Sequence, residues 1–232
     1  MKIAIYGDSF GYEHPIFGID HPKLKEINPS WVTLLRKEYS IDNFCYPASD
    51  LYFSYNNFIS NYKKFNLNIF IATNPHRLSV KHSDKFIHNS GLNSAESKLE
   101  TDTDLTRKKV HKAAVDYFLY LQDDERDIVL STLIKDSVKT LDKNCIIIDA
   151  FGKDGLFNIT LMENETWSIT PSYTLLDSFL DLRYCHMTEE NNYILYNLID
   201  NCIKNQSNFE FNLSNFITPT FDERKKYLIK KP

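Results

Sequence analysis

The chain has 232 residues, and its 42% hydrophobic and 25% charged content is typical of a globular protein with a sizeable core. A formal net charge of −4 argues against non-specific binding to nucleic acid. No run approaches the roughly 20 apolar residues that a membrane-spanning helix needs, and the four cysteines show no paired spacing that would predict a zinc site or disulfide framework. With no room for a signal peptide before the first apolar run, we expect a cytoplasmic protein. We also expect neither a metal ion nor an organic cofactor.

The first eleven residues, MKIAIYGDSFG, combine a short apolar run with a polar turn. Residues 3–6 predict a buried strand, and Gly7, Asp8 and Ser9 predict the turn that ends it. A serine just past the end of a first strand lies where open α/β sheets hold their ligands. On these residues alone an ordinary polar turn explains the pattern equally well.

The next elements alternate between strand and helix. Residues 10–27 predict an irregular loop whose histidines lack the further ligands of a metal site. Asn28 and Pro29 predict the start of a helix, residues 41–46 predict a second strand, and Asp50 is expected to cap a helix over 51–63. A third strand is expected over 67–73, and Pro75 is expected to stop its pairing because proline has no backbone N–H to donate. This alternation predicts a parallel sheet with right-handed crossovers.

The second half of the chain is more mixed. Residues 78–103 are polar and predict an irregular insertion or lid, in which a short helix is expected because the segment is long. The elements expected after it are two helices over 105–122 and 124–142, a strand over 145–150, an edge strand over 156–162, a helix over 171–180 and a last helix from Thr188 to about 204. The tail, residues 206–232, has no clear pattern. We predict one α/β domain over residues 1–232, a three-layer α/β/α arrangement with a flavodoxin-like parallel sheet.

Three side chains fall in loops that such a sheet can bring together. Ser9 follows the first strand, Asn74 follows the third, and His186 directly precedes the last helix. The carboxyl ends of parallel strands lie at one edge of the sheet, and a loop histidine can reach that edge. A nucleophile, a base and an amide donor are the groups that acyl transfer from an ester needs.

These residues give the sequence a resemblance to the SGNH hydrolases, also called GDSL-type esterases, over most of the chain. Gly7-Asp8-Ser9 matches their first block. The resemblance implies an oxyanion hole made by the backbone N–H groups of Ser9 and Ala48 and by the side chain of Asn74. Ala48 stands where the family has glycine.

The family's last block, Asp-x-x-His, is altered here. Arg183 stands three residues before His186, and Asp181 is the nearest upstream acid. The resemblance implies that Ser9 and His186 are catalytic, with Asp181 as the third member of the triad or a backbone carbonyl in its place. Asp8 is expected to shape the turn rather than to transfer protons.

Several residues near these blocks allow two interpretations. Arg77, with His76 beside it, could bind a substrate carboxylate or phosphate, or could pair with a nearby acid. The aromatic cluster of Tyr46, Tyr52, Phe53 and Tyr55 could line a sugar or acyl pocket, although packing against the sheet is the preferred interpretation. In having an Asn-Pro-His-Arg motif and no predicted signal peptide, the sequence resembles small phage-encoded members of the family.

The sequence thus predicts a serine hydrolase that cleaves an acetyl or short acyl ester, with a small molecule or a glycan as substrate. No nucleic-acid or membrane partner is expected, and the sequence does not indicate the oligomeric state. The alternative hypothesis is a binding or structural protein that keeps the fold with weak or no catalysis, because Ala48 and Arg183 depart from the catalytic blocks. A flavodoxin-like nucleotide binder is set aside, since no phosphate-cradling glycine loop is present.

Overall fold

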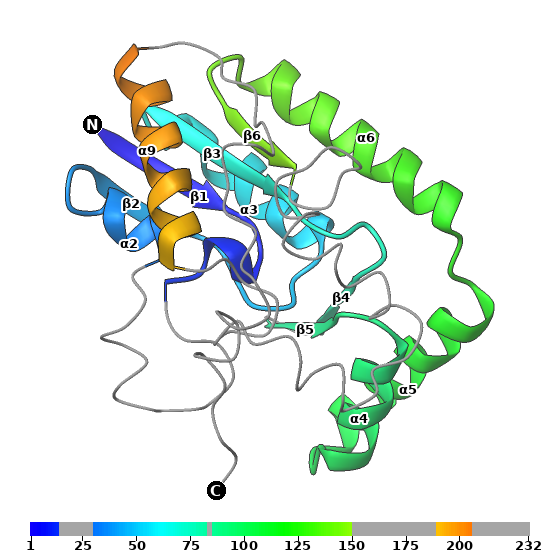
Figure 1. Cartoon of the computed structure of the whole chain (residues 1–232). Helices are drawn as coiled ribbons and strands as arrows, with labels where there is room; N and C mark the ends of the chain where they lie inside the picture. Colours follow the sequence, from blue (N-terminus) through cyan, green and yellow to red (C-terminus); the bar gives the residue numbers. More distant parts are fainter. Residues whose placement is uncertain (14–29, 83–84, 150–188, 206–232) are drawn as a thin grey trace, which may run out of the picture. The chain divides into compact units, whose positions relative to one another are not determined.

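A computed structural model describes residues 1–13, 30–82, 85–149 and 189–205 (Figure 1). The chain divides into two compact units. The first unit consists of Met1–Gly11 and Ser40–Ile148, and the second of Tyr12–Tyr39 and Asp149–Pro232. Within the described ranges no helix is both long and apolar enough to cross a membrane.

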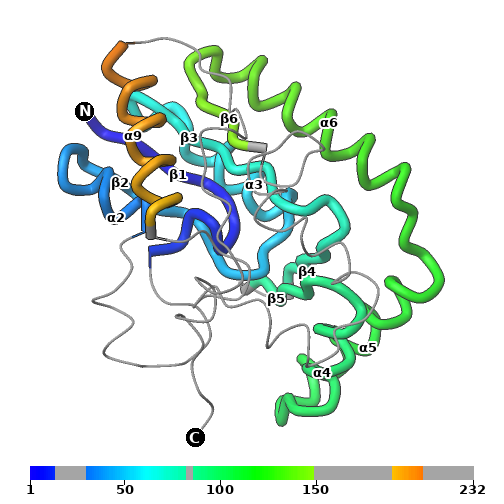
Figure 2. The backbone as a smooth tube through the Cα atoms, viewed as in Figure 1, coloured from blue at the N-terminus to red at the C-terminus, as the bar shows by residue number. Residues whose placement is uncertain are grey.

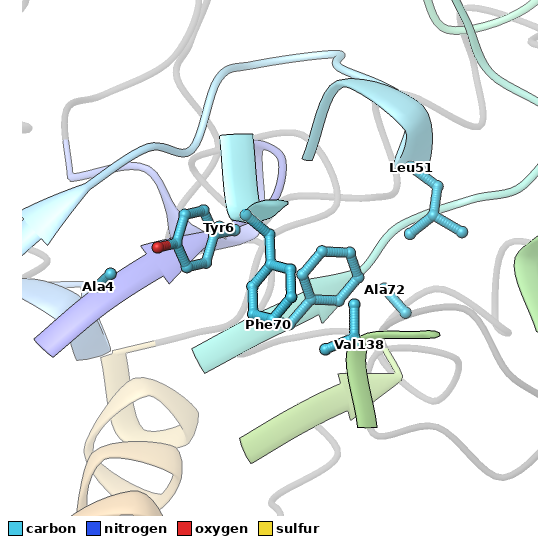
Figure 3. Packing of buried hydrophobic residues seen from close by; sticks show 7 residues of the cluster. Ala4, Tyr6, Leu51, Phe70, Ala72 and Val138 are labelled. Carbon is cyan, nitrogen blue, oxygen red and sulfur yellow. The ribbon is translucent and has the colours of Figure 1, made fainter. Parts of the chain in front are cut away.

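The first unit is built on a four-stranded sheet. Its strands, in the order β2-β1-β3-β6, are Ser40–Asn43, Lys2–Tyr6, Leu67–Ala72 and Ile146–Asp149. Strand β1 pairs in parallel with β2 and with β3, and the arrows of β1, β3 and β6 point the same way in Figure 3. The predicted parallel α/β sheet is confirmed, with the second strand ending at Asn43 rather than at residue 46.

Two helices, α3 (Leu51–Asn61) and α6 (Asp124–Leu141), cover one face of this sheet. Alternate residues of a strand point to opposite faces, so Ala4, Tyr6, Phe70 and Ala72 share a face. This face packs against Leu51 and Phe58 of α3 and Val138 of α6 (Figure 3). Ile3, Ile5, Ile69 and Ile71, which point the other way, are fully buried as well.

Helix α3 begins as predicted. The carboxylate of Asp50 caps it by accepting a hydrogen bond from the Phe53 N–H at 2.8 Å. After Asn61 the chain tightens into the short 3-10 helix η2 (Tyr62–Lys64) before entering β3. Helix α6 follows α5 (Leu105–Tyr120) after a break at residues 121–123, where the sequence predicted one.

The segment predicted to be irregular contains regular structure. Strands β4 (Leu78–His82) and β5 (Lys85–Asn89) form an antiparallel hairpin. Helix α4 (Leu92–Thr101) follows it and confirms the short helix expected in this segment. Figure 2 traces the chain from this hairpin through α4 into α5. The prediction of an irregular stretch was wrong because its polar residues alternate with apolar ones, as in Leu78-Ser79-Val80-Lys81, and such alternation suits a half-buried strand.

In the second unit, helix α2 (Trp31–Leu35) packs against α9 (Glu189–Asn205). The Trp31 N–H donates to the Asn192 side chain at 3.0 Å, and the Tyr39 hydroxyl donates to Asp200 at 2.6 Å. The cap of α2 is Ser30, which accepts from the Thr33 N–H, so the prediction that Asn28 caps this helix was wrong. Helix α9 confirms the predicted last helix.

The predicted edge strand, the helix over 171–180 and the tail over 206–232 lie outside the described residues, as do Asp181, Arg183 and His186. The expectation of one domain, with the insertion acting as a lid, stays a prediction.

Candidate active site

Ser9 lies at the start of the 3-10 helix η1 (Ser9–Gly11), directly after β1. A Cβ atom on Gly7 would lie 2.7 Å from Ile71 Cβ, so only glycine lets the turn approach β3 this closely. Ser9 itself is 8% exposed. Among the described residues its hydroxyl has no hydrogen-bond partner, and its N–H is the first of η1 and therefore is not used within that helix.

Asp8 is fully buried and organises the turn. Its Oδ1 accepts from the Phe10 N–H at 3.1 Å, and its Oδ2 accepts from Thr73 Oγ1 at 2.7 Å and from Arg77 Nη1. These contacts join the loop after β1 to the loop after β3. The expectation that Asp8 shapes the turn fits these contacts.

Arg77 holds a third loop in place as well. Its Nη1 donates to the Ser49 carbonyl at 3.3 Å and to Thr73 Oγ1 at 3.0 Å in addition to Asp8. Its side chain is 12% exposed. The geometry supports the alternative in which Arg77 pairs with an acid, and direct contact of Arg77 with a substrate stays a prediction.

The loop that carries Ala48 is anchored to the turn after β1. The Gly7 carbonyl accepts from the Tyr46 N–H and from Ser49 Oγ, both at 3.1 Å. Ala48 has a φ of +59°, in the left-handed region that glycine adopts most easily. The alanine therefore holds a backbone conformation that a glycine would adopt more easily, and its N–H has no partner among the described residues.

Asn74 begins the loop after β3. Its Oδ1 accepts from the His76 N–H at 2.8 Å, and its carbonyl accepts from the Arg77 N–H. Because the oxygen is used in this local turn, the side-chain amide is oriented and its Nδ2 remains free to donate within the described part of the chain. Asn74 is half-buried, so this donor is held on a fixed backbone.

His76 lies on another side of this loop, against the start of α6. Its Nδ1 is 3.3 Å from an oxygen of Asp124 and 3.4 Å from one of Asp127. The three possible ligand atoms lie within 4.8 Å of one another, a spacing that a cation could span. The expectation of no metal site stays a prediction, as does a substrate role for His76.

The sequence interpretation missed a buried polar network between the Ala48 loop and the hairpin. Asp50 accepts from the Ser79 N–H at 2.7 Å, and its own N–H donates to Ser79 Oγ. Ser79 Oγ also lies 2.7 Å from His88 Nδ1. Burial raises the pKa of Asp50, whereas burial, with Lys98 and Arg77 nearby, lowers the pKa of His88 to about 4.

The aromatic residues singled out in the sequence divide into two groups. Tyr55 packs on the core of the sheet, as the preferred interpretation expected. Tyr46 is 51% exposed and, with Phe53, packs on the ring of His88. These rings enclose His88 and account for its burial.

Comparison with known proteins gives structural similarities only. No protein-family model matches the chain, and no curated protein does. A lipase/acylhydrolase from Enterococcus faecalis is 16% identical and has a TM-score of 0.39, with 88% of this chain and 96% of that chain covered. An acetyl xylan esterase, AlAXEase, is 14% identical, with a TM-score of 0.36 and coverage of 88% and 100%. A G-D-S-L family lipolytic protein from Veillonella parvula DSM 2008 is 11% identical, with a TM-score of 0.24 and coverage of 72% and 82%.

The described residues thus define an α/β protein with a parallel sheet flanked by helices and a serine-centred group of side chains after its first and third strands. The structures to which it is similar carry hydrolase names, at low identity and low TM-score. The assignment that follows therefore depends on the chain's own residues.

Proposed function

We propose that the chain is a serine ester hydrolase of the SGNH type. The observation that carries this proposal is a set of three hydrogen-bond donors that have no partner among the described residues and lie in the turn of Ser9 or in loops tied to it: the Ser9 N–H, the Ala48 N–H and the Asn74 amide. The first lies at the start of η1, the second depends on the +59° φ of Ala48, and the third is oriented by the His76 N–H. Donors fixed before the reaction and aimed at developing negative charge are the largest single contribution in acyl-transfer catalysis.

In the proposed reaction Ser9 Oγ attacks the carbonyl carbon of the ester while its proton passes to His186. The carbonyl oxygen becomes the oxyanion that the three donors hold. The bond to the alcohol oxygen then breaks, and His186 returns the proton to the leaving alcohol. A water molecule attacks the acyl-serine in the same way and releases the carboxylic acid and free Ser9.

Asp181 is proposed to orient the imidazole of His186. Arg183 occupies the position where the family has aspartate, so Asp181 would have to act from five residues upstream. If no carboxylate orients the base, the rate falls but the nucleophile remains. The acyl group is proposed to be acetyl or a short acyl chain, on a small molecule or a carbohydrate.

A fluorophosphonate probe tests this function because it labels only activated serines. We expect labelling of the wild-type protein, with the modified peptide containing Ser9, and no labelling of Ser9→Ala. His186→Ala is expected to lose labelling, whereas Ser60→Ala, which changes an exposed serine of α3, is expected to keep it. A folded wild-type protein that does not react would refute the enzyme and favour a binding role.

A further inference from the structure

A histidine and two aspartates of the first unit converge on one another without taking part in the proposed reaction. His76 comes from the loop after β3, and Asp124 and Asp127 come from the first turn of α6. Each residue contributes one nitrogen or oxygen atom, and these atoms all lie within 4.8 Å of one another. The cluster thus joins two elements that are far apart in the sequence.

The spacing of these atoms matches that of the ligands around a metal ion. His76 Nδ1 lies 3.3 Å from an oxygen of Asp124 and 3.4 Å from one of Asp127. Zinc binds nitrogen and oxygen ligands at about 2.0–2.2 Å, and at tetrahedral angles two such ligands lie about 3.4 Å apart. The side chain of Asp124 is 72% exposed, so a rotation of its carboxylate can close the remaining distance to Asp127.

A hydrogen bond from His76 does not explain why two carboxylates approach the same nitrogen. Nδ1 carries at most one hydrogen, so it can donate fully to only one of the two acids. The other carboxylate then faces a second negative charge without compensation, which is unfavourable. A divalent cation bonds to all three atoms and offsets both negative charges.

The burial of Asp127 is independent evidence for a ligand at this position. Its side chain is 6% exposed, yet its two side-chain contacts within the described residues, to His76 Nδ1 and to Arg126 Nη2, are both 3.4 Å long. Charge-assisted hydrogen bonds are typically about 2.7–2.9 Å long. Arg126 Nη2 donates at 2.7 Å to the Tyr117 hydroxyl instead. A buried carboxylate with such long contacts is poorly satisfied, and it faces His76.

The helix dipole does not account for the whole cluster. Acids in the first turn of a helix stabilise it, which explains the exposed Asp124 and Glu125 but not the burial of Asp127 against an imidazole. Residues 123–127 contain four acids and one arginine. This charge outweighs the half positive charge, roughly, that the dipole places at the helix start, so the local field favours a cation.

We propose that His76, Asp124 and Asp127 bind a divalent transition metal ion, with zinc as the best match and water completing its coordination. Imidazole nitrogen favours zinc and its first-row neighbours over magnesium and calcium, which prefer oxygen ligands. The ion ties the loop after β3 to α6. Such a site is independent of the ester hydrolysis proposed above, and it departs from the expectation, based on the sequence, of a protein without a metal ion.

Isothermal titration calorimetry with zinc sulfate tests the site on the full chain after treatment with a chelator. We expect one zinc ion per chain in the tightest class of sites, and no competition from magnesium chloride. His76→Ala and Asp127→Asn each remove a ligand and should weaken zinc binding at least tenfold, since losing a residue that only supports a metal ligand already costs about 10–100-fold. Asp127→Asn keeps the shape of the side chain and provides the test should His76→Ala fail to fold.

Glu125→Gln is the matched control for Asp124→Asn. Both substitutions remove one negative charge from an exposed position in the same turn of α6, but Glu125 is not a proposed ligand. Asp124→Asn should weaken zinc binding, whereas Glu125→Gln should keep an affinity close to that of the wild type. Equal losses in the two variants would show that zinc responds only to the charge of the helix end, and would overturn the site.

Cobalt(II) chloride reports on the ligands directly, because the visible absorption of cobalt changes with its coordination. The wild-type protein should give a cobalt spectrum that zinc abolishes and that folded Asp127→Asn lacks. A wild-type protein that binds neither ion, or zinc binding that is unchanged in both His76→Ala and Asp127→Asn, would overturn the proposal. Because no ester is used, these outcomes leave the proposed function untouched.

Discussion

Replacing Asp8 with alanine tests how the three loops of the candidate site are held. The substitution removes the acceptor for the Phe10 N–H, the Thr73 hydroxyl and the Arg77 guanidinium. Asp8 is fully buried and Arg77 is 12% exposed, so water cannot readily replace the lost carboxylate. The variant therefore removes the Asp8 carboxylate from a largely buried cation.

Breaking a buried ion pair by removing one partner costs about 3–5 kcal/mol. The free energy of unfolding of a domain is typically about 5–15 kcal/mol, so Asp8→Ala should remove a large part of it. Ion pairs on the surface contribute about 0–1 kcal/mol. The Lys2–Asp42 pair, at 3.0 Å with both side chains more than 40% exposed, provides the control: Asp42→Ala should cost far less than Asp8→Ala.

Urea unfolding followed by tryptophan fluorescence measures both costs, and a double-mutant cycle with Arg77→Met measures the coupling of the pair. Contacting residues in one network couple by about 0.5–3 kcal/mol, so the double variant should be clearly more stable than the sum of the single losses predicts. A loss below about 1 kcal/mol for Asp8→Ala, which is the size of a surface pair, or additive single effects would refute this account of the loops.

Three further changes test the donors and the buried histidine. Asn74→Ala should lower kcat by about 10²–10³ without unfolding the protein, as measured by ester hydrolysis and circular dichroism; an unchanged kcat would remove Asn74 from the oxyanion hole. Ala48→Gly should keep activity and Ala48→Val should lose it, because a β-branched residue is strongly disfavoured at a φ of +59°; equal kcat values would contradict the proposed donor. His88 has its pKa lowered from 6.5 to about 4, so between these values the unfolded chain binds more protons, and the free energy of unfolding should fall as pH drops from about 6.5 towards 4. His88→Phe should reduce that slope in urea titrations at several pH values, and an unchanged slope would assign it to other groups.

Local patterns predicted much of the sheet and its helices. The apolar runs of β1 and β3, the Asp50 cap and the break between α5 and α6 are each encoded within a few neighbouring residues. The hairpin was missed because polar composition outweighed a real alternation of apolar and polar residues in β4. Ser79 and His88 are buried there, where Ser79 bonds to both Asp50 and His88.

The candidate site was predictable in its residue types but not in its contacts. Ser9 and Asn74 follow strands whose apolar runs are clear in the sequence, so their loops could be placed at one sheet edge. The Asp8–Arg77 pair joins positions 69 residues apart, and the conformation of Ala48 is imposed by the loop around it. Neither feature has a local sequence signal.

The close fit of the turn after β1 also determines which sequence changes can occur first. A Cβ at Gly11 would lie 2.3 Å from Cys45 Sγ and 2.7 Å from Ile71 Cδ1. Cys45→Ala and Ile71→Val remove those two atoms, so Gly11→Ala should be tolerated after them and not before. At Gly7 the obstructing atom is Ile71 Cβ, which every residue except glycine retains. Gly11 can therefore be substituted once Cys45 and Ile71 have been replaced. Gly7 must remain glycine as long as position 71 carries a side chain.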